Sequence, residues 1–287
     1  MTEMAFAHLL ARKWLNEDIA RGPKPTAKGT PFRYSDAHGC SRKMQYSALN
    51  ATTTEPWDAA SAWVTNLGTL LHEHLQEAIA EQAPNAQFEV ASQVNEYLSG
   101  SCDGYIPGPL GIGNGLVLEI KTVGQYVFNS QAGYGNYKRT EPKGPKWSAI
   151  VQAGMNAIGI ERGGEPEVEF LALISLAKEA VSVNKAKTLG ITDPYERFAQ
   201  EWWFPRHEWE GPALEEINRI TQIAEDTKDG LLVQPSVVED DLSHKNITPG
   251  SYWACDYCPF RTLCEQDAGT THIEASYLTV LATSEEK

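Results

Sequence analysis

The segment LVLEIKTV, residues 116–123, most constrains how this chain can fold. Most of its positions are apolar or β-branched, which predicts a buried strand. Side chains alternate across a strand, so Val117, Glu119 and Lys121 share one face of it. A charged pair on one face of an otherwise apolar strand indicates either a solvated sheet edge or a functional site.

The pattern on both sides of this segment predicts an α/β fold. Apolar alternation predicts strands over residues 86–94, 101–106, 116–123, 167–177 and 180–186. Helical periodicity predicts helices over residues 4–20, from about Cys40, and over 59–82, 147–160, 193–202 and 211–229. Strands at the centre with helices before and after them favour a central mixed sheet flanked by helices.

No linker divides the chain convincingly, so we expect a single domain over residues 1–287. Within it we distinguish an N-terminal helical segment, a core, a cysteine-rich C-terminal segment and a tail, over residues 1–58, 59–190, 191–270 and 271–287. The first residues lack the apolar h-region of a signal peptide, and no run approaches the ~18 apolar residues of a membrane span. We therefore expect a cytoplasmic protein without a membrane partner.

Charge is distributed unevenly along the chain. There are 24 Lys and Arg against 38 Asp and Glu, a net charge of −14, which argues against a nonspecific nucleic-acid coat protein. Basic residues nevertheless gather in residues 21–46 and 121–147. This distribution is compatible with a local nucleic-acid path on an acidic body, and equally with ordinary solvated loop charge.

Asp103 supplies a second carboxylate, from the predicted strand that precedes the charged one. A Gly/Pro-rich turn joins residues 101–106 to residues 116–123, which predicts a hairpin with Asp103 beside Glu119. Neighbouring carboxylates raise each other's pKa unless a cation intervenes, and hard oxygen ligands favour Mg²⁺ or Mn²⁺. Lys121 would then lie beside the attacking water and offset developing charge. The alternative is an exposed hairpin with a cross-strand salt bridge.

The cysteines suggest a second metal centre. Cys255, Cys258 and Cys264 form a C-x2-C-x5-C set, and a [4Fe–4S] cluster or structural Zn²⁺ takes four thiolates. Cys40 and Cys102 are the candidates for the fourth, and Cys102 alternates away from Asp103 toward the core. We expect ligation to join the two ends of the chain in place of apolar packing.

Taken together, these motifs resemble a known nuclease family. The pattern D-x15-E-x-K, from Asp103 to Lys121, resembles the core of the PD-(D/E)xK nucleases. Gly68-x-x-x-His72 and Gln152 resemble the RecB-like branch, although Asn156 stands where that branch has tyrosine. With Cys40 before these motifs and three cysteines after them, residues 38–267 are similar to the CRISPR-associated iron–sulfur exonucleases.

The resemblance implies a restriction-endonuclease-like core and a role for each motif residue. His72, Asp103, Glu119 and the Ile120 carbonyl would hold Mg²⁺ or Mn²⁺. Lys121 would position water, and Gln152 would fix Lys121 or the scissile phosphate. Cys40 would complete a [4Fe–4S] cluster with Cys255, Cys258 and Cys264, with Zn²⁺ as the alternative.

The implied activity is a DNA exonuclease acting mainly on single strands, 5′→3′, in repair, recombination or CRISPR adaptation. Its partners would be DNA, a helicase, recombination or CRISPR-adaptation protein, or a second copy. The candidates for DNA contact are Arg42, Lys43, Tyr137, Lys138, Arg139, Lys143, Lys146 and Trp147. Two rivals stay open: a non-catalytic protein that binds DNA ends, and a zinc-stabilised structural protein.

Overall fold

The structure is a computed structural model that describes residues 13, 15–17, 29–55, 59–108 and 114–273. The chain divides into two compact units. We call them the sheet unit (Gly68–Ser92 and Ser101–Ala213) and the cysteine unit (Met1–Leu67, Gln93–Gly100 and Leu214–Lys287). Most of the helix expected over residues 4–20, and most of the tail 271–287, lies outside the described residues. Among the described helices, none combines the length and apolar character that crossing a membrane requires.

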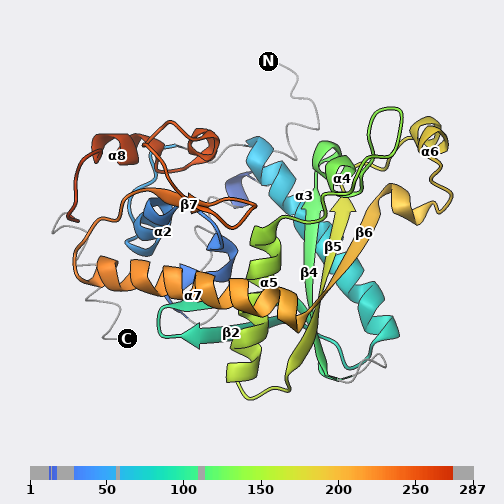
Figure 1. The fold of residues 1–287 in the computed structure, drawn as a ribbon, viewed down its shortest axis with the longest axis horizontal. Helices are drawn as coiled ribbons and strands as arrows, with labels where there is room; N and C mark the ends of the chain where they lie inside the picture. Colours follow the sequence, from blue (N-terminus) through green and yellow to red (C-terminus); the bar gives the residue numbers. More distant parts are fainter. Residues whose placement is uncertain (1–12, 14, 18–28, 56–58, 109–113, 274–287) are drawn as a thin grey trace. The chain divides into compact units, whose positions relative to one another are not determined.

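The sheet unit is built on a mixed sheet (Figure 1). Its central strands are β3 (Leu98–Ile106), β4 (Gly115–Val123), β5 (Val168–Ala177) and β6 (Ala199–Pro205), and β2 (Gln87–Asn95) pairs with β3. β3 and β4 are antiparallel, β4 and β5 parallel, and β5 and β6 antiparallel. The predicted hairpin and the predicted mixed α/β architecture are therefore confirmed.

Helices cover both faces of the central strands. Leu116 and Leu118 of β4 pack with Ile79 of α3 (Ala59–Gln82) and with Ala83, the residue that follows this helix. On the other face of β4, Lys121 meets α5 (Trp147–Arg162). The apolar and charged faces of the strand thus contact different helices, as the alternation of its residues predicts.

The segment between β5 and β6 differs from the prediction. Residues 180–186 were expected as a strand, but α6 (Val183–Leu189) begins there, because the Ser182 side chain caps it by accepting a hydrogen bond from the Lys185 N–H. Gly190, at φ 66°, ends the helix. The helix expected over 193–202 is wrong as well, since residues 199–205 pair with β5 as β6.

The cysteine unit contains short elements around one end of a long helix. Its elements are β1 (Phe32–Arg33), η1 (Tyr34–Asp36), α2 (Ser41–Ala48), the end of α7 (Arg206–Lys228), β7 (Ser236–Val238), β8 (His244–Asn246), η3 (Trp253–Tyr257) and α8 (Arg261–Gln266). The side chains of α2 reach segments that are almost two hundred residues later in the chain. Ser41 donates to the Gln234 carbonyl, and Gln45 donates to the Leu231 carbonyl.

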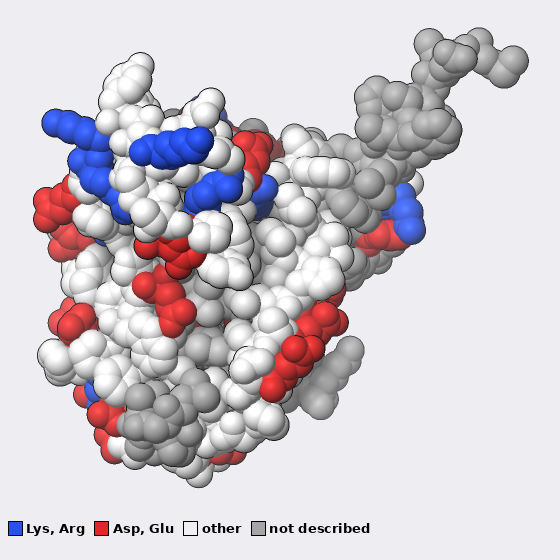
Figure 2. Space-filling view, turned by 90° about the vertical axis from the view of Figure 1, so that its right-hand side faces the viewer, with Lys and Arg blue, Asp and Glu red and all other residues white. Residues whose placement is uncertain are grey.

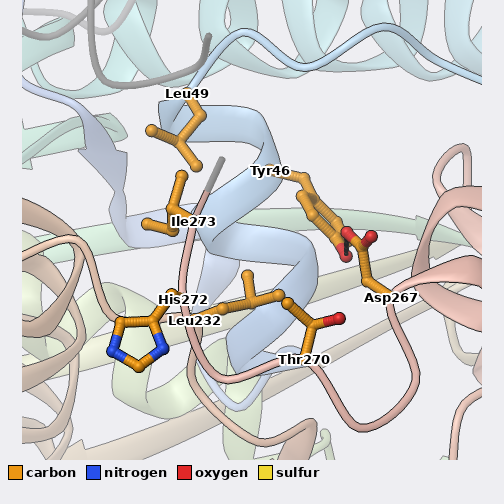
Figure 3. A pocket seen from close by; sticks show the side chains of 7 residues that line it. All are labelled: Tyr46, Leu49, Leu232, Asp267, Thr270, His272 and Ile273. Carbon is orange, nitrogen blue, oxygen red and sulfur yellow. Dashed lines mark hydrogen bonds between the residues drawn. The ribbon is translucent and has the colours of Figure 1, made fainter. Parts of the chain in front are cut away.

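Apolar packing also holds this unit together. Tyr46 of α2 and Leu49, the residue that follows this helix, form a buried cluster with Leu232, Phe260 and Ile273. The Tyr46 hydroxyl donates to Asp267 Oδ2 at 2.7 Å, and both residues line a void of about 10 Å³, room for no more than one water (Figure 3). The expectation that ligation stands in for packing here is therefore wrong, because the two segments share an apolar core of their own.

Candidate functional site

Glu119 is the buried centre of the charged strand. Its side chain is 1% exposed, and its Oε1 lies 2.6 Å from Lys121 Nζ. Its other oxygen, Oε2, is buried with no hydrogen-bond partner among the described residues. Burial raises the pKa of Glu119 to about 7, with the Asp103 charge adding to this and Lys121 opposing it. A buried carboxylate with one unsatisfied oxygen is costly unless a further cation or donor reaches it.

Asp103 reaches Glu119 from the neighbouring strand. The register of the hairpin sets Gly104 opposite Leu118, which brings Asp103 alongside Glu119. Asp103 Oδ2 accepts a hydrogen bond of 2.6 Å from the Ile120 N–H, and Oδ1 lies 3.6 Å from His72 Nδ1. The predicted pairing of the two carboxylates is thus present in the structure.

Helix α3 brings His72 to these carboxylates. A Cβ on Gly68 would stand 3.0 Å from Thr122 Oγ1, so the absence of a side chain lets this turn of the helix approach β4 closely. His72 follows one turn later. Burial acts to lower the pKa of His72, but the hydrogen bond and charge of Asp103 outweigh it and leave the pKa above its ordinary value.

Gln76 is a contact that sequence reasoning missed. Its side-chain nitrogen donates to the Asp103 carbonyl at 2.8 Å and to Glu89 Oε1 at 3.1 Å. His72 and Gln76, on successive turns of α3, therefore contact the carboxylate and the backbone carbonyl of Asp103, respectively. The four-residue step from His72 to Gln76 was the available signal, since it places both side chains on one face of the helix.

Lys121 lies between an acid and an amide. Its Nζ donates to Gln152 Oε1 on α5 at 3.0 Å, in addition to its contact with Glu119. Burial acts to lower the pKa of Lys121, but the Glu119 charge and hydrogen bond prevail and hold it above its ordinary value. Lys121 is therefore an ammonium group with a fixed direction. Asn156, one turn after Gln152, is fully buried.

The donors in this cluster fit a hard divalent cation in chemistry. Two carboxylates, one imidazole and the unsatisfied Glu119 oxygen are the ligand types that Mg²⁺ and Mn²⁺ accept. Among the described residues, however, no three His, Cys, Asp or Glu side chains converge closely enough to form a metal-ion site. The side chains of this cluster instead contact one another, chiefly through the Glu119–Lys121 and His72–Asp103 pairs.

Four cysteines gather in the cysteine unit. Cys40 caps the start of α2, Cys255 lies in η3, Cys258 follows η3 and Cys264 lies in α8. The thiols influence one another: burial raises the pKa values of Cys40, Cys258 and Cys264, and neighbouring thiols of the four add to each increase. Four thiols suit a tetrathiolate centre in donor chemistry, although no three His, Cys, Asp or Glu side chains of the described residues converge closely enough to form a metal-ion site.

Cys102 stands apart from these four. It is fully buried in β3, and burial raises its pKa to about 12, with the charges of Glu119 and Asp103 adding to the increase. Those neighbours belong to the carboxylate cluster of the sheet unit. The expectation that Cys102 is a small core residue is therefore confirmed, while the assignment of Cys40 as the fourth thiol beside Cys255, Cys258 and Cys264 stays a prediction.

The candidate DNA-contacting residues differ in exposure. Those that are exposed are Lys43, Tyr137, Lys138, Arg139, Lys143 and Lys146, and Trp147 is half-buried. Figure 2 shows Lys and Arg side chains gathered on the face of the sheet unit where the loop over residues 132–146 and α6 lie. Arg139 stacks on the Tyr134 ring and donates hydrogen bonds to the Leu189 carbonyl and to Glu196. Its guanidinium therefore already has partners within the protein.

For Arg42, the structure corrects the set of DNA contacts that the sequence suggested. Its side chain is buried, 3% exposed, and its donors are turned to backbone carbonyls of the cysteine unit. A buried guanidinium cannot follow a phosphate backbone at the surface, so Arg42 leaves the set of proposed DNA contacts.

Comparison with known proteins gives distant structural likenesses. No family model and no curated protein matches this chain. The crystal structure of SSO0001 is 18% identical, with a TM-score of 0.47 over 93% of this chain and 98% of that one. An alkaline exonuclease from Laribacter hongkongensis is 11% identical, with a TM-score of 0.43 over 76% and 93%.

A phage-related exonuclease from Haemophilus somnus 129PT is 12% identical, with a TM-score of 0.39 over 65% of this chain and 78% of that one. Because the identities are low and the TM-scores lie below 0.5, these likenesses carry no argument about chemistry. The chemistry of this protein is therefore argued from its described side chains.

Proposed function

We propose that this protein is a metal-dependent DNA exonuclease, acting mainly on single strands in the 5′→3′ direction. The observation that carries the proposal is the buried Glu119, whose Oε1 contacts Lys121 while its Oε2 has no partner in the described structure. A divalent cation held by Glu119 and Asp103 would satisfy that oxygen and relieve the repulsion of the two carboxylates.

The proposed metal ligands are His72, Asp103, Glu119 and the Ile120 carbonyl. Mg²⁺ or Mn²⁺, when bound there, supplies Lewis-acid activation of a phosphate oxygen and of water. The two carboxylates come from adjacent strands, and β4 also carries Lys121 on the same face as Glu119. One strand thus presents both an acid and an amine to the same phosphate.

Lys121 orients the attacking water and stabilises the negative charge that develops on the phosphate oxygens. The water oxygen forms a bond to phosphorus as the bond from phosphorus to the 3′ oxygen breaks. The leaving oxygen ends as a 3′-hydroxyl, and the other product carries a 5′-phosphate. Gln152 accepts a hydrogen bond from Lys121, so it holds the ammonium in position and touches the reacting atoms only through Lys121.

The surface of the sheet unit supports a polyanionic substrate. Tyr137 is 86% exposed, and Lys138 and Lys143 are exposed in the same loop, which follows β4 and α4 (Gln125–Gln131). Exposed aromatic rings stack on unpaired bases, and neighbouring ammonium groups bind the phosphates between them. Tyr126, 87% exposed in α4, extends the aromatic surface beyond the residues that the sequence suggested.

The proposal includes a tetrathiolate centre at Cys40, Cys255, Cys258 and Cys264, occupied by a [4Fe–4S] cluster or by Zn²⁺. Its support is the donor chemistry of four free thiols and the packing of Cys258 and Cys264 against the apolar cluster that contains Tyr46 and Phe260. We assign the centre a structural part in the cysteine unit, separate from hydrolysis.

The decisive experiment compares 5′- and 3′-labelled single strands and duplexes, incubated with Mn²⁺, Mg²⁺ or EDTA. We expect metal-dependent shortening of single strands from one end by the wild type, and none by Glu119→Gln or Lys121→Met. Glu225→Gln, an exposed acid in α7, is the matched control and should retain activity. DNA binding without cleavage in all lanes would instead identify a protein that only holds DNA ends.

A further inference from the structure

Residues 133–140 form a tight hairpin on the sheet unit, in the loop between α4 and α5. Tyr134 and Arg139 pair across it as an antiparallel bridge, and the Thr140 N–H donates to the Gly133 carbonyl at 2.8 Å. Gly133 has φ 69°, and a side chain there would collide with the Thr140 carbonyl. The two arms of this segment, which we call the 133–140 hairpin, therefore meet more closely than a residue with a side chain would allow.

The first arm of the hairpin is fixed in the core of the sheet unit. Tyr134 is buried in an apolar cluster with Phe128 of α4 and Leu189 of α6, and its ring meets the Phe128 ring edge-on. Its hydroxyl donates to the Glu196 carbonyl at 2.9 Å. The hairpin thus rises from a packed and hydrogen-bonded side chain, which sets its direction.

Arg139 holds the second arm. Its guanidinium lies over the Tyr134 ring, 4.8 Å from the ring centroid. Nε donates to the Leu189 carbonyl at 3.2 Å, and NH2 donates to Glu196 Oε2 at 3.3 Å. One planar group therefore contacts the opposite arm, α6 and the segment before β6, and a lysine ammonium has no planar face to do the same. These contacts suit a residue that supports the hairpin better than one that binds phosphate.

The tip of the hairpin carries Tyr137. Its side chain is 86% exposed, and Asn136 and Lys138 on either side of it are exposed as well. A ring on a fixed support loses little conformational freedom on binding, so more of its contact energy appears as affinity. An aromatic ring beside an ammonium group matches a nucleobase beside its phosphate.

We propose that Arg139 is a positioning residue, which fixes the 133–140 hairpin so that Tyr137 stacks on an unpaired base of the bound single strand. This inference rests on the proposed function for its ligand, DNA, but it does not depend on hydrolysis. The Arg139 charge acts within the protein, and the base contacts the ring that Arg139 supports. Every base offers a stacking face, so the contact adds affinity without sequence preference.

The test measures binding of a fluorescein-labelled single strand by anisotropy at several salt concentrations, in EDTA so that no hydrolysis interferes. Tyr137 is changed to Ala, Leu or Phe, Arg139 to Gln or Lys, and Tyr137→Ala is combined with Arg139→Gln. Stacking is followed separately by the quenching of 2-aminopurine placed at successive positions of the strand.

Arg162→Gln is the matched control for charge. Arg162 is exposed and ends α5, about 22 Å along the helix from Trp147, where the loop that contains the hairpin ends. This length exceeds the Debye length of about 8 Å at physiological ionic strength. The control therefore reports the effect of removing one positive charge from the sheet unit without touching the hairpin.

We expect Tyr137→Ala and Tyr137→Leu to weaken binding by about tenfold and to lose the quenching, and Tyr137→Phe to stay within about twofold of wild type. Arg139→Gln and Arg139→Lys should each weaken binding by about three- to tenfold, because the ring is no longer held in place. The salt slope of Arg139→Gln should match that of Arg162→Gln. The double variant should bind about as well as Tyr137→Ala, since Arg139 acts through that ring.

Two results would overturn the role of Arg139. A slope for Arg139→Gln that is lower than that of the control by about 0.7, with Arg139→Lys at wild-type affinity, would make Arg139 a phosphate contact. Losses that multiply in the double variant would show that Arg139 acts independently of Tyr137. If Arg139→Gln does not fold, as judged by far-UV circular dichroism, the affinity of Arg139→Lys decides.

The stacked base has its own contradicting outcomes. Wild-type affinity and quenching in Tyr137→Ala, or equal affinities of Tyr137→Leu and Tyr137→Phe, would remove it. A wild type that binds no single strand would remove this inference together with the proposed DNA substrate. Binding with quenching, but without metal-dependent cleavage in the nuclease assay, would overturn the proposed hydrolysis and leave this inference standing.

Discussion

Lys121 and Gln152 are joined by a 3.0 Å hydrogen bond from the lysine Nζ to the glutamine Oε1. The bond connects the strand that carries the proposed catalytic groups to helix α5. It leaves Lys121 with a fixed direction even before substrate arrives. Preorganised charge of this kind is worth more in catalysis than charge that must be moved into place during the reaction.

We expect Gln152→Leu to lower kcat by roughly tenfold, which corresponds to about 1.4 kcal/mol, the usual size of one hydrogen bond to a charged group. The Lys121 ammonium remains, so KM for a labelled single strand should change little. Steady-state kinetics with Mn²⁺ separate the two constants. A rise in KM with kcat unchanged would mean that Gln152 binds the substrate instead of orienting Lys121.

Gly68 and Thr122 set the distance between α3 and β4. Gly68→Ala places a methyl group 3.0 Å from Thr122 Oγ1, and we expect α3 to move by a few tenths of an ångström, taking His72 away from Asp103. We predict about three- to tenfold lower activity, since small displacements of catalytic groups are costly. Thr122→Ala makes room for the methyl group, so the double variant should regain activity. Activities of the single and double variants that simply multiply would contradict this contact.

Divalent metal should stabilise the wild type through Glu119 and Asp103. At a concentration of one hundred times its Kd, a ligand that binds only the folded state adds about 2.7 kcal/mol to the free energy of unfolding. We expect Mn²⁺ to raise the Tm of the wild type, measured by differential scanning fluorimetry. The same titration should leave Glu119→Gln and Asp103→Asn unchanged. Equal shifts in all three proteins would place the metal elsewhere.

Lys138 and Lys143 should contribute to DNA affinity through phosphate contacts. Each contact releases a condensed counterion, so removing one should reduce the slope of log K against log salt by about 0.7 for a single strand. We expect this from Lys138→Ala and Lys143→Ala in fluorescence anisotropy. Arg42→Lys, altered at a buried position, should leave the slope unchanged. A lysine variant with the wild-type slope would lie off the DNA path.

Arg206 makes a bidentate contact with Glu161 that should stabilise the sheet unit. NH1 and NH2 lie 2.6 and 3.1 Å from the two Glu161 oxygens, and NH1 also donates to the Val168 carbonyl at 3.2 Å. Arg206→Lys loses this two-pronged contact, and we expect the free energy of unfolding in urea to fall by about 1–3 kcal/mol. Arg261→Lys, at a more exposed salt bridge that water screens, should leave the free energy of unfolding nearly unchanged.

Much of the sheet unit follows from its sequence. The alternation in β4 predicted which residues share a face, and the turn before it predicted the hairpin that brings Asp103 to Glu119. The spacing of His72 and Gln76 places them on one face of α3, but the atoms that Gln76 and Gly68 contact could not be predicted, because they depend on which strand that helix meets. Short elements were misassigned for a similar reason: the alternation over residues 180–186 resembled a strand, while the Ser182 cap favoured a helix.

The charge pattern misled the interpretation of Arg42. A basic residue in a basic segment resembles a nucleic-acid contact, and sequence alone does not show which side of a short helix is covered. The signal was the spacing of Ser41, Arg42 and Gln45, polar residues on one side of α2. All three direct hydrogen bonds to the C-terminal part of the chain.

The partners of α2 have a consequence for how the protein is made. Ser41, Arg42 and Gln45 bond to residues that lie 182 to 228 positions later. Contacts this distant in sequence form slowly, and during synthesis their second half does not yet exist. Most strands and helices of the sheet unit emerge from the ribosome before residue 214. They can therefore fold before the residues that bond to α2 have been synthesised. If the four cysteines hold the proposed metal centre, we expect its loading to be one of the last events in maturation, open only to a nearly finished polypeptide.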